Sequence, residues 1–354
     1  MQASLSGYGN HRSIICERCT FVDLLPISTT GSKASSTIFR LKAIGTFAPS
    51  VVIFQLKLVS SSESIKATPH SLQERNSPSK LLLFSVTTLL SSIPATLVLS
   101  TMTGPKSPSL QFKPQHPDFG AECSGVDFSR PVSEDVISAI RAGMAKYGVL
   151  VFRQTALDDA GHVAFAGQFG ELDDSTTWIK AGQKYRLAPY VQLTDVGNLE
   201  EDGLPVSTDS MRHQINLGNG LFHVDCSYNA RRAGFSLLRA HQLPPRGTGG
   251  GTEFADTRTA YADLDQATKD KIQDLVLCHS LWYSRQLGAP DNAILKQIDP
   301  AAQAMGRHKL VQLHEPSGRQ NLYIAWHAHH VDGWSKEASR PVIEDLLRHA
   351  SQDK

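Results

Sequence analysis

The sequence predicts an α+β protein, mainly β, with a double-stranded β-helix (jelly-roll) core and flanking helices. Three observations favour this fold. Apolar segments of strand length recur from residue 149 onward, Gly- and Pro-rich turns separate them, and capped helices stand on both sides. A His-x-Asp tripeptide follows a Gly-Asn-Gly turn, and the mouth of such a barrel suits a metal ion.

The first hundred residues differ in kind from the rest. Residues 1–101 hold 19 Ser and nine Lys or Arg against four Asp or Glu, with few clear periods. This composition resembles a transit peptide but is far too long for one, so we expect a disordered or spurious N-terminal extension. Domain-like sequence begins at Met102, and residues 102–354 are expected to form one domain. Within the extension, 81–100 lacks charges but is a weak membrane candidate because of its Ser, Thr and Pro content.

The elements follow in order from residue 132. Ser133 is expected to cap a helix that Gly148 ends, with Val136, Ile140 and Met144 on one face. The predicted elements after it are a strand at 149–153, a capped helix ending near Gly170, a polar lid-like region at 173–219, strands at 234–243 and 252–256, a helix at 265–277, a strand at 321–331 and an amphipathic helix at 335–354.

Charge and cysteine content narrow the function. The formal net charge of +1 provides no basic stripe for nucleic acid, so a small molecule is the expected partner. The five cysteines are scattered and odd in number, which argues against a secreted disulfide framework and favours the cytoplasm. A homo-oligomer is compatible with the sequence, and membrane association is not expected.

The tripeptide at His223 and Asp225 is the first candidate site. If its segment is a strand, the period of two sends both side chains to one face. An imidazole and a carboxylate together can hold Fe(II), Mn(II) or Zn(II), although an ordinary hydrogen-bonded pair has the same spacing.

Four motifs around the tripeptide then occur in a specific order. They are Asn219 four residues before it, the block LPPRGTGGGTEFADTRTAYADL at 243–264, HSLWYSR at 279–285, and HEPSGRQNLYIAWHAHHVDGW at 314–334. With these motifs, residues 102–354 resemble the Fe(II)/2-oxoglutarate-dependent dioxygenases of the taurine dioxygenase family, and most of all the 2,4-dichlorophenoxyacetate dioxygenase branch.

The resemblance implies a function and roles. The activity would be hydroxylation of a small organic acid, an aryloxyacetate-like carboxylate or a sulfonate, by O2 and 2-oxoglutarate, with release of succinate and CO2. His223 and Asp225 would bind Fe(II), Thr252 would hold a carboxylate of 2-oxoglutarate, and Asn219 would face the substrate. Asn219 and Thr252 also fit plain turn and strand-start positions.

The histidines of WHAHH leave several readings open. On a strand, His327 and His329 would share one face and His330 the other. They are candidates for substrate binding (His327 and His330), for a third metal ligand (His327 or His329), or for ordinary hydrogen bonding. Four arginines are candidates for holding an acidic substrate, namely Arg231, Arg232, Arg239 and Arg246.

One departure from the family concerns the C-terminal end. The family's second ligand histidine and its keto-acid arginine are expected beyond Lys354, which would leave the barrel incomplete there, with an unpaired edge and two protein ligands for iron. The readings are a truncated form of a working enzyme, an inactive homologue that retains a binding role, and a different cupin-like metalloenzyme that uses His327 or His329.

Overall fold

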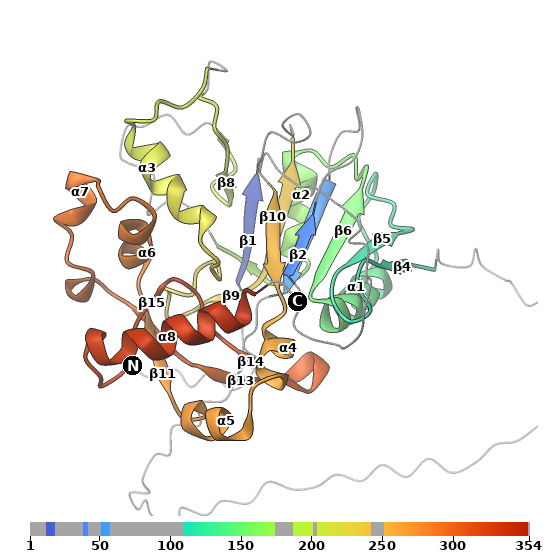
Figure 1. Cartoon of the computed structure of the whole chain (residues 1–354). Coiled ribbons are helices and arrows are strands. Elements are labelled where there is room, and N and C mark those ends of the chain that lie inside the picture. The colour runs from blue at the N-terminus through green and yellow to red at the C-terminus, as the bar shows by residue number, and fades with distance from the viewer. Residues whose placement is uncertain are drawn as a thin grey trace, which may run out of the picture. The chain divides into compact units, whose positions relative to one another are not determined.

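The structure, a computed structural model, describes residues 12–17, 38–41, 51–56, 109–173, 187–200, 204–241 and 251–352. All the elements named below belong to one compact unit formed by residues 1–60 and 110–354 (Figure 1). The strands are β1 (Arg12–Glu17), β2 (Ile38–Leu41), β3 (Val51–Leu56), β4 (Gln111–Pro114), β5 (Ala121–Ser124), β6 (Val149–Arg153), β7 (Glu171–Leu172), β8 (Leu193–Asp195), β9 (Ala233–Ala240), β10 (Thr252–Ala255), β11 (Val276–His279), β12 (Gly306–Lys309), β13 (Val311–His314), β14 (Arg319–Leu322) and β15 (Ala328–Val331). The helices are α1 (Glu134–Tyr147), α2 (Asp159–Gly167), α3 (Met211–Leu217), α4 (Thr257–Ala262), α5 (Gln266–Ile272), α6 (Leu281–Gly288), α7 (Ala293–Lys296) and α8 (Lys336–Ala350), with 3₁₀ turns η2 (Gly218–Gly220), η3 (Pro300–Ala302) and η4 (Glu315–Ser317).

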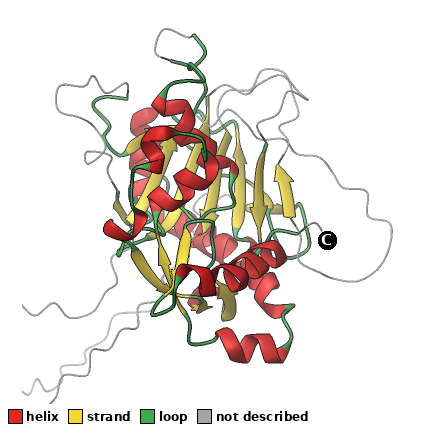
Figure 2. Cartoon of the chain, turned by 60° about the vertical axis from the view of Figure 1, so that its left-hand side comes forward, coloured by secondary structure: helices red, strands yellow, loops and turns green. Residues whose placement is uncertain are grey.

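The largest sheet has the strand order β4-β5-β6-β3-β9-β1-β7, with β8 also paired to β1. Figure 2 shows its strands lying side by side as one layer. The sheet is mixed, because β5 and β6 run parallel, as do β1 and β9. For β5 and β6 the reason is the connection: a crossover helix, α1, joins them, and such a connection allows a parallel pair.

Three strands of the structure come from residues 1–101: β1 and β3 lie in the large sheet, and β2 lies in a separate two-stranded sheet. β3 lies between β6 and β9, β1 pairs with the other edge of β9, and β2 pairs with β10. Both edges of β9 are therefore hydrogen-bonded. The rest of the predicted extension lies outside the described residues, and so does the candidate membrane segment at 81–100.

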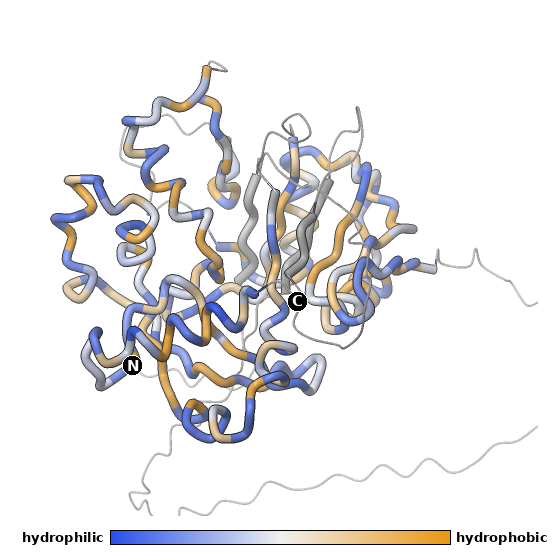
Figure 3. The backbone as a smooth tube through the Cα atoms, in the orientation of Figure 1, coloured by the Kyte–Doolittle hydropathy of each residue, from blue (hydrophilic) through white to orange (hydrophobic). Residues whose placement is uncertain are grey.

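The first core lies between the large sheet and helices α1 and α2. Ser133 precedes α1 in extended conformation and Gly148 follows it, so the predicted bounds are confirmed. Ile137, Ile140 and Met144 are fully buried on one face of α1, and the first four residues of β6 are buried as well. This apolar run appears as the hydrophobic colour along β6 in Figure 3.

The second core lies under α8, which packs across β15. The predicted apolar face of this helix is confirmed, with Ile343, Leu346 and Leu347 buried. Two sequence predictions are wrong here. The helix at 265–277 ends at Ile272, because the following residues pair with β12 and β15 as β11. The strand at 321–331 is interrupted by a turn at residues 326–327, which separates β14 from β15.

None of the helices in the described part of the chain combines the length and the apolar character that a bilayer crossing would need.

Candidate metal and substrate site

His223 and Asp225 lie close together, although their segment is not a strand. They occupy the loop between η2 and β9, so the condition of a strand is not met, but His223 Nε2 lies 3.1 Å from Asp225 Oδ1. Both side chains are about one-third exposed, at 29% and 34%, which leaves them accessible to a ligand.

Hydrogen bonds orient both members of this dyad. His223 Nδ1 lies 2.6 Å from the carbonyl oxygen of Leu221. A carbonyl only accepts, so Nδ1 carries the proton and Nε2 keeps its lone pair, the arrangement that metal-binding histidines use. Ser236 Oγ on β9 donates to Asp225 Oδ2 at 2.9 Å, which leaves Oδ1 toward His223. The two donors thus fit a divalent metal.

A tight turn directly after Asp225 fixes the dyad's position. Cys226 has φ of 55°, a left-handed conformation that costs a non-glycine residue about 1–2 kcal/mol. Its thiol faces Asp173 Oδ2 at 3.5 Å and the Tyr228 hydroxyl at 3.8 Å. In the same turn the Ser227 amide donates to Val224 O. Such strain persists only where the surroundings hold it in place.

Those surroundings are a buried histidine cluster. Ser227 Oγ bridges His327 Nδ1 at 2.9 Å and His279 Nδ1 at 3.1 Å. His308 Nε2 donates to the carbonyl oxygens of Ser227 and Asn229, at 2.9 and 3.0 Å. β12 can approach this turn because it begins with glycine, since a Cβ at Gly306 would collide with the Ser227 carbonyl.

The histidines of this cluster are uncharged at neutral pH. Burial, together with the charge of the nearby Arg232, lowers the pKa of His279 to about 3 and that of His308 to about 4. Burial also lowers the pKa of His327 well below its ordinary value, aided by His223. Neutral imidazoles next to the dyad do not repel a metal cation.

His327 is the one member of WHAHH that these contacts bring to the dyad. Its ring centroid lies 5.8 Å from that of His223 and 5.3 Å from that of Tyr228. It precedes β15 instead of lying on it, so the prediction that it shares a strand face with His329 is wrong. The ring of His329 packs on Tyr283, and its Nδ1 lies 2.8 Å from Nδ1 of His330. The contacts therefore do not bring His330 to the dyad.

Asn219, four residues before His223 in the chain, is held by Arg285, for which the sequence alone predicted no role. Arg285 on α6 donates from Nη1 to Asn219 Oδ1 at 2.9 Å and to Ile215 O at 3.0 Å. Arg285 is the last residue of the HSLWYSR motif, so its place in that motif was a usable signal. Thr252, the predicted 2-oxoglutarate residue, is half-buried at the start of β10, and its role stays a prediction.

The arginines singled out from the sequence have other partners. Arg231 pairs with Glu171 at 2.6 Å, and Arg239 pairs with Asp159. Arg232 donates to Gln312 and lies over the Tyr323 ring, 4.2 Å from its centroid. Arg246 lies outside the described residues.

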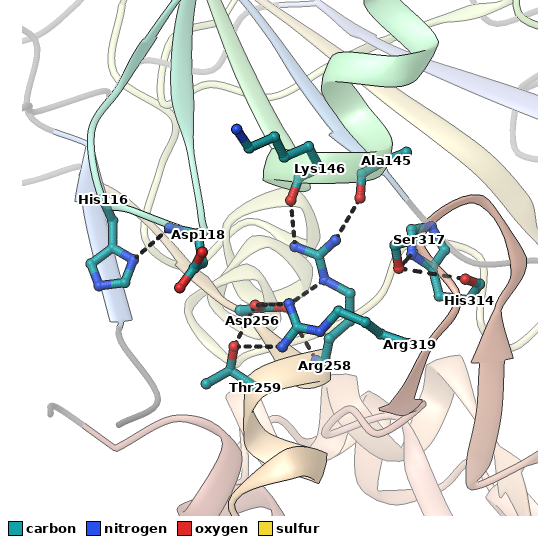
Figure 4. A network of polar contacts seen from close by, with 10 residues as sticks. All are labelled: His116, Asp118, Ala145, Lys146, Asp256, Arg258, Thr259, His314, Ser317 and Arg319. Carbon is teal, nitrogen blue, oxygen red and sulfur yellow. Dashed lines mark hydrogen bonds and ion pairs between the residues drawn. The ribbon is translucent and has the colours of Figure 1, made fainter. Parts of the chain in front are cut away.

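A second polar network lies at the start of α4, within the sequence motif at 243–264 (Figure 4). Arg258 on α4 forms a buried ion pair with Asp256 at 2.9 Å and donates to Ala145 O at 2.8 Å. It thereby satisfies a carbonyl at the C-terminal end of α1. Arg319 adds a longer ion pair to Asp256, at 3.6 Å. This network holds α4 against α1 and is structural.

Within the described residues, no group of three or more His, Cys, Asp or Glu side chains is arranged to hold a metal ion. His223 and Asp225 thus form a dyad on an α+β fold, with the neutral His327 beside it, and their role as metal ligands stays a prediction. The second histidine and the arginine expected beyond Lys354 stay predictions.

An oriented His-x-Asp dyad of this kind is a feature of mononuclear metal oxygenases. The family model for the taurine catabolism dioxygenase TauD, TfdA family matches residues 111–354, well over half of the chain. The chain belongs to this family.

Individual relatives agree. The chain is 33% identical over 239 residues to the alpha-ketoglutarate-dependent 2,4-dichlorophenoxyacetate dioxygenase of Burkholderia sp. (strain RASC), covering 68% of this chain and 78% of the relative. It is 29% identical over 254 residues to the (S)-phenoxypropionate/alpha-ketoglutarate-dioxygenase of Delftia acidovorans, covering 69% and 80%. A solved structure, AAD-2 in complex with Mn(II) and N-oxalylglycine, matches with a TM-score of 0.54 and 31% identity over 69% of this chain and 81% of that one.

Family membership defines the class of enzyme. The chain is a 2-oxoglutarate-dependent dioxygenase of the Fe(II) class, whose reactants are a small molecule, 2-oxoglutarate and O2. The family expectation from the sequence is thereby confirmed.

Proposed function

We propose that this chain hydroxylates a small organic acid, an aryloxyacetate-like carboxylate or a sulfonate, and releases succinate and CO2 from 2-oxoglutarate. The single observation that carries the proposal is the convergence of His223 Nε2 and Asp225 Oδ1 at 3.1 Å, on a chain 33% identical to a 2,4-dichlorophenoxyacetate dioxygenase. We also infer that the described sheets belong to a double-stranded β-helix, as in that family.

The residues divide the work as follows. His223 and Asp225 would hold Fe(II), which supplies the oxidation chemistry when bound. The Leu221 carbonyl keeps the lone pair of His223 on Nε2, and Ser236 holds the outer oxygen of Asp225. Thr252 would donate its hydroxyl hydrogen to a carboxylate of 2-oxoglutarate. Asn219 and His327 would face the substrate.

The substrate's reacting position follows from its chemistry. Hydroxylation of the carbon beside the ether oxygen of an aryloxyacetate gives a hemiacetal, which collapses to a phenol and glyoxylate. One O2 then accounts for the hydroxyl oxygen and for one new oxygen in succinate, with the lost carboxyl group leaving as CO2. The protein's own contribution is to orient the carbon and to keep water out.

The experiment is a coupled measurement of succinate and phenol from the Fe(II)-loaded chain with 2-oxoglutarate, O2 and either phenoxyacetate or 2,4-dichlorophenoxyacetate. We expect both products in equal amounts, and their loss in His223→Ala. His330→Ala is the matched control and should keep activity, since its contacts are with His329. The absence of succinate with every substrate would contradict the proposal and favour an inactive homologue that only binds.

A further inference from the structure

A thiol and a phenol lie against each other directly after the dyad. Cys226 follows Asp225 in the chain and is not part of a disulfide. Its Sγ lies 3.8 Å from the Tyr228 hydroxyl oxygen and 3.5 Å from Asp173 Oδ2. A thiol has one hydrogen and a carboxylate only accepts, so the thiol donates to Asp173 and the phenol donates to the sulfur. The sulfur therefore turns a lone pair toward the phenol.

The backbone holds this pair in place. The left-handed conformation of Cys226 and the hydrogen bond from the Asn229 amide to Cys226 O, at 3.0 Å, close the turn that brings the two side chains together. His308 Nε2 donates to the carbonyl oxygens of Ser227 and Asn229, on either side of Tyr228. With the chain fixed on both sides of the phenol, the thiol and the phenol stay together.

Contacts between rings join the pair to the dyad. The Tyr228 ring packs edge-on against His327, with 5.3 Å between the ring centroids, and the His327 ring lies 5.8 Å from that of His223. Cys226 is bonded to Asp225 through the backbone and is only 7% exposed. Burial shields its sulfur from oxidants in bulk solvent, so the dyad is the nearest source of oxidation.

The pairing of a thiol with a phenol is specific to Cys226. The structure describes two other cysteines, Cys123 and Cys278, and both are buried. Cys278 Sγ lies 3.8 Å from Asp332 Oδ1. Among the cysteines of the described residues, Cys226 alone has a hydrogen bond with a phenol. It is also the one that directly follows a residue of the dyad.

An oxidant formed at the dyad can join the two side chains. Removal of the phenol hydrogen spreads an unpaired electron onto the ring carbons beside the hydroxyl group, and the sulfur can bond to one of them. The S–C bond forms, and the S–H bond and the C–H bond at that ring carbon break. One O2 and one 2-oxoglutarate take up the two hydrogens and two electrons, and the products are succinate, CO2 and one water.

We propose that Cys226 and Tyr228 form a thioether cross-link when the Fe(II)-loaded chain reacts with O2 and 2-oxoglutarate in the absence of a substrate. The bond joins Cys226 Sγ to the ring carbon next to the Tyr228 hydroxyl group, and Asp173 is placed to take the thiol proton. The proposal rests on the proposed function in one respect, since the iron that supplies the oxidation is held by the dyad. The cross-link fixes the turn that follows Asp225.

The test is peptide mass spectrometry of the full chain. The chain is prepared without O2 and then incubated with Fe(II), 2-oxoglutarate and O2. Both residues lie in one tryptic peptide, 213–231, whose only Lys or Arg is Arg231. After reduction and alkylation, the cross-linked peptide should be two hydrogens lighter than the unmodified peptide and carry no alkyl group. Fragments from cleavage between Cys226 and Tyr228 should be missing, which locates the bond.

Variants assign the two partners. Tyr228→Phe keeps the ring without its hydroxyl group, and Cys226→Ser removes the sulfur, so both should abolish the cross-linked peptide. Cys278→Ser changes another buried cysteine and is the matched control, which should form the cross-link as wild type does. Omission of Fe(II) or of 2-oxoglutarate should leave the peptide alkylated and unchanged in mass.

The wild-type peptide decides the outcome, so a variant that fails to fold does not leave the proposal open. An alkylated peptide without the loss of two hydrogens, while phenoxyacetate yields succinate, would overturn the cross-link and leave the proposed function standing. Addition of oxygen to Cys226 or Tyr228 without the lighter peptide would also overturn it, in favour of simple oxidation. The absence of both succinate and the lighter peptide would refute both proposals.

Discussion

Acid should destabilise this protein well above the pH at which carboxylates protonate. Three histidines, His162, His279 and His308, are at most 8% exposed, and burial lowers their pKa to about 3, 3 and 4. In the unfolded chain each would titrate near its ordinary value of 6.5. Between about pH 6.5 and 4 the unfolded state therefore binds protons that the folded state does not, and the free energy of unfolding falls as the pH falls.

The magnitude follows from linkage. Each pH unit below 6.5 costs about 1.4 kcal/mol for each such group. At pH 5.5 the three histidines together should lower the free energy of unfolding by about 4 kcal/mol relative to pH 8. That is a large share of the about 5–15 kcal/mol that a typical domain has.

The assay is urea unfolding of the full chain, followed by circular dichroism between pH 8 and 5.5. His162→Leu is the informative variant, because neither ring nitrogen of His162 has a hydrogen-bond partner among the described residues. It should be as stable as wild type or more so at pH 8, and its pH dependence should be shallower by about one proton. A free energy of unfolding that stays flat to pH 5.5, or an unchanged slope in His162→Leu, would refute this reasoning.

Three further predictions concern the site and its support. Ser236→Ala removes the hydrogen bond that orients the dyad's carboxylate and should weaken Mn(II) binding about tenfold to a hundredfold by calorimetry; an unchanged affinity would mean that this bond does not orient the ligand. Arg258→Met leaves Asp256 buried with its main ion pair broken and should lower the free energy of unfolding, measured by urea unfolding, by about 3–5 kcal/mol. A loss below about 1 kcal/mol would contradict a stabilising role for this buried ion pair. Gly306→Ala would push its Cβ into the turn at Ser227, directly after the dyad, and should reduce Mn(II) affinity. Gly167→Ala, with open space around it, is the control and should leave Mn(II) affinity unchanged. Equal changes in Mn(II) affinity in the two variants would contradict a supporting role for this turn.

Local patterns in the sequence were sufficient for the isolated elements. The start of α1 after Ser133, its end at Gly148 and the apolar face of α8 depend on neighbouring residues only, and the structure confirms all three, although the Ser133 side chain makes no capping hydrogen bond. The errors arise where tertiary pairing decides. Residues 276–279 continue a helical pattern but form β11, because β12 and β15 lie on either side of them.

The pairing of strands from residues 1–101 had no signal in the sequence. β1 and β3 flank β9 from far away along the chain, and composition alone favoured an extension without structure there. Pairing between distant strands depends on a shared register and on available edges, which no local pattern encodes.

The sequence predicted that His223 and Asp225 lie close together, but it did not predict the residues that hold them in place. The structure confirms the proximity, although a loop brings the two side chains together instead of a strand, and their role as metal ligands stays a prediction. Ser227 and Arg285 were missed, because their roles depend on histidines and a turn that are distant in sequence. Arginine at the end of HSLWYSR becomes informative only when its neighbours in space are known.

The most direct test of the account is an anaerobic titration of this chain with Fe(II) and then 2-oxoglutarate, with the visible absorption spectrum recorded at each step. The account predicts a weak charge-transfer band that saturates with 2-oxoglutarate and is absent in His223→Ala. No band in wild type, or an equal band in His223→Ala, would contradict the assignment of His223 and Asp225 as the iron and 2-oxoglutarate site.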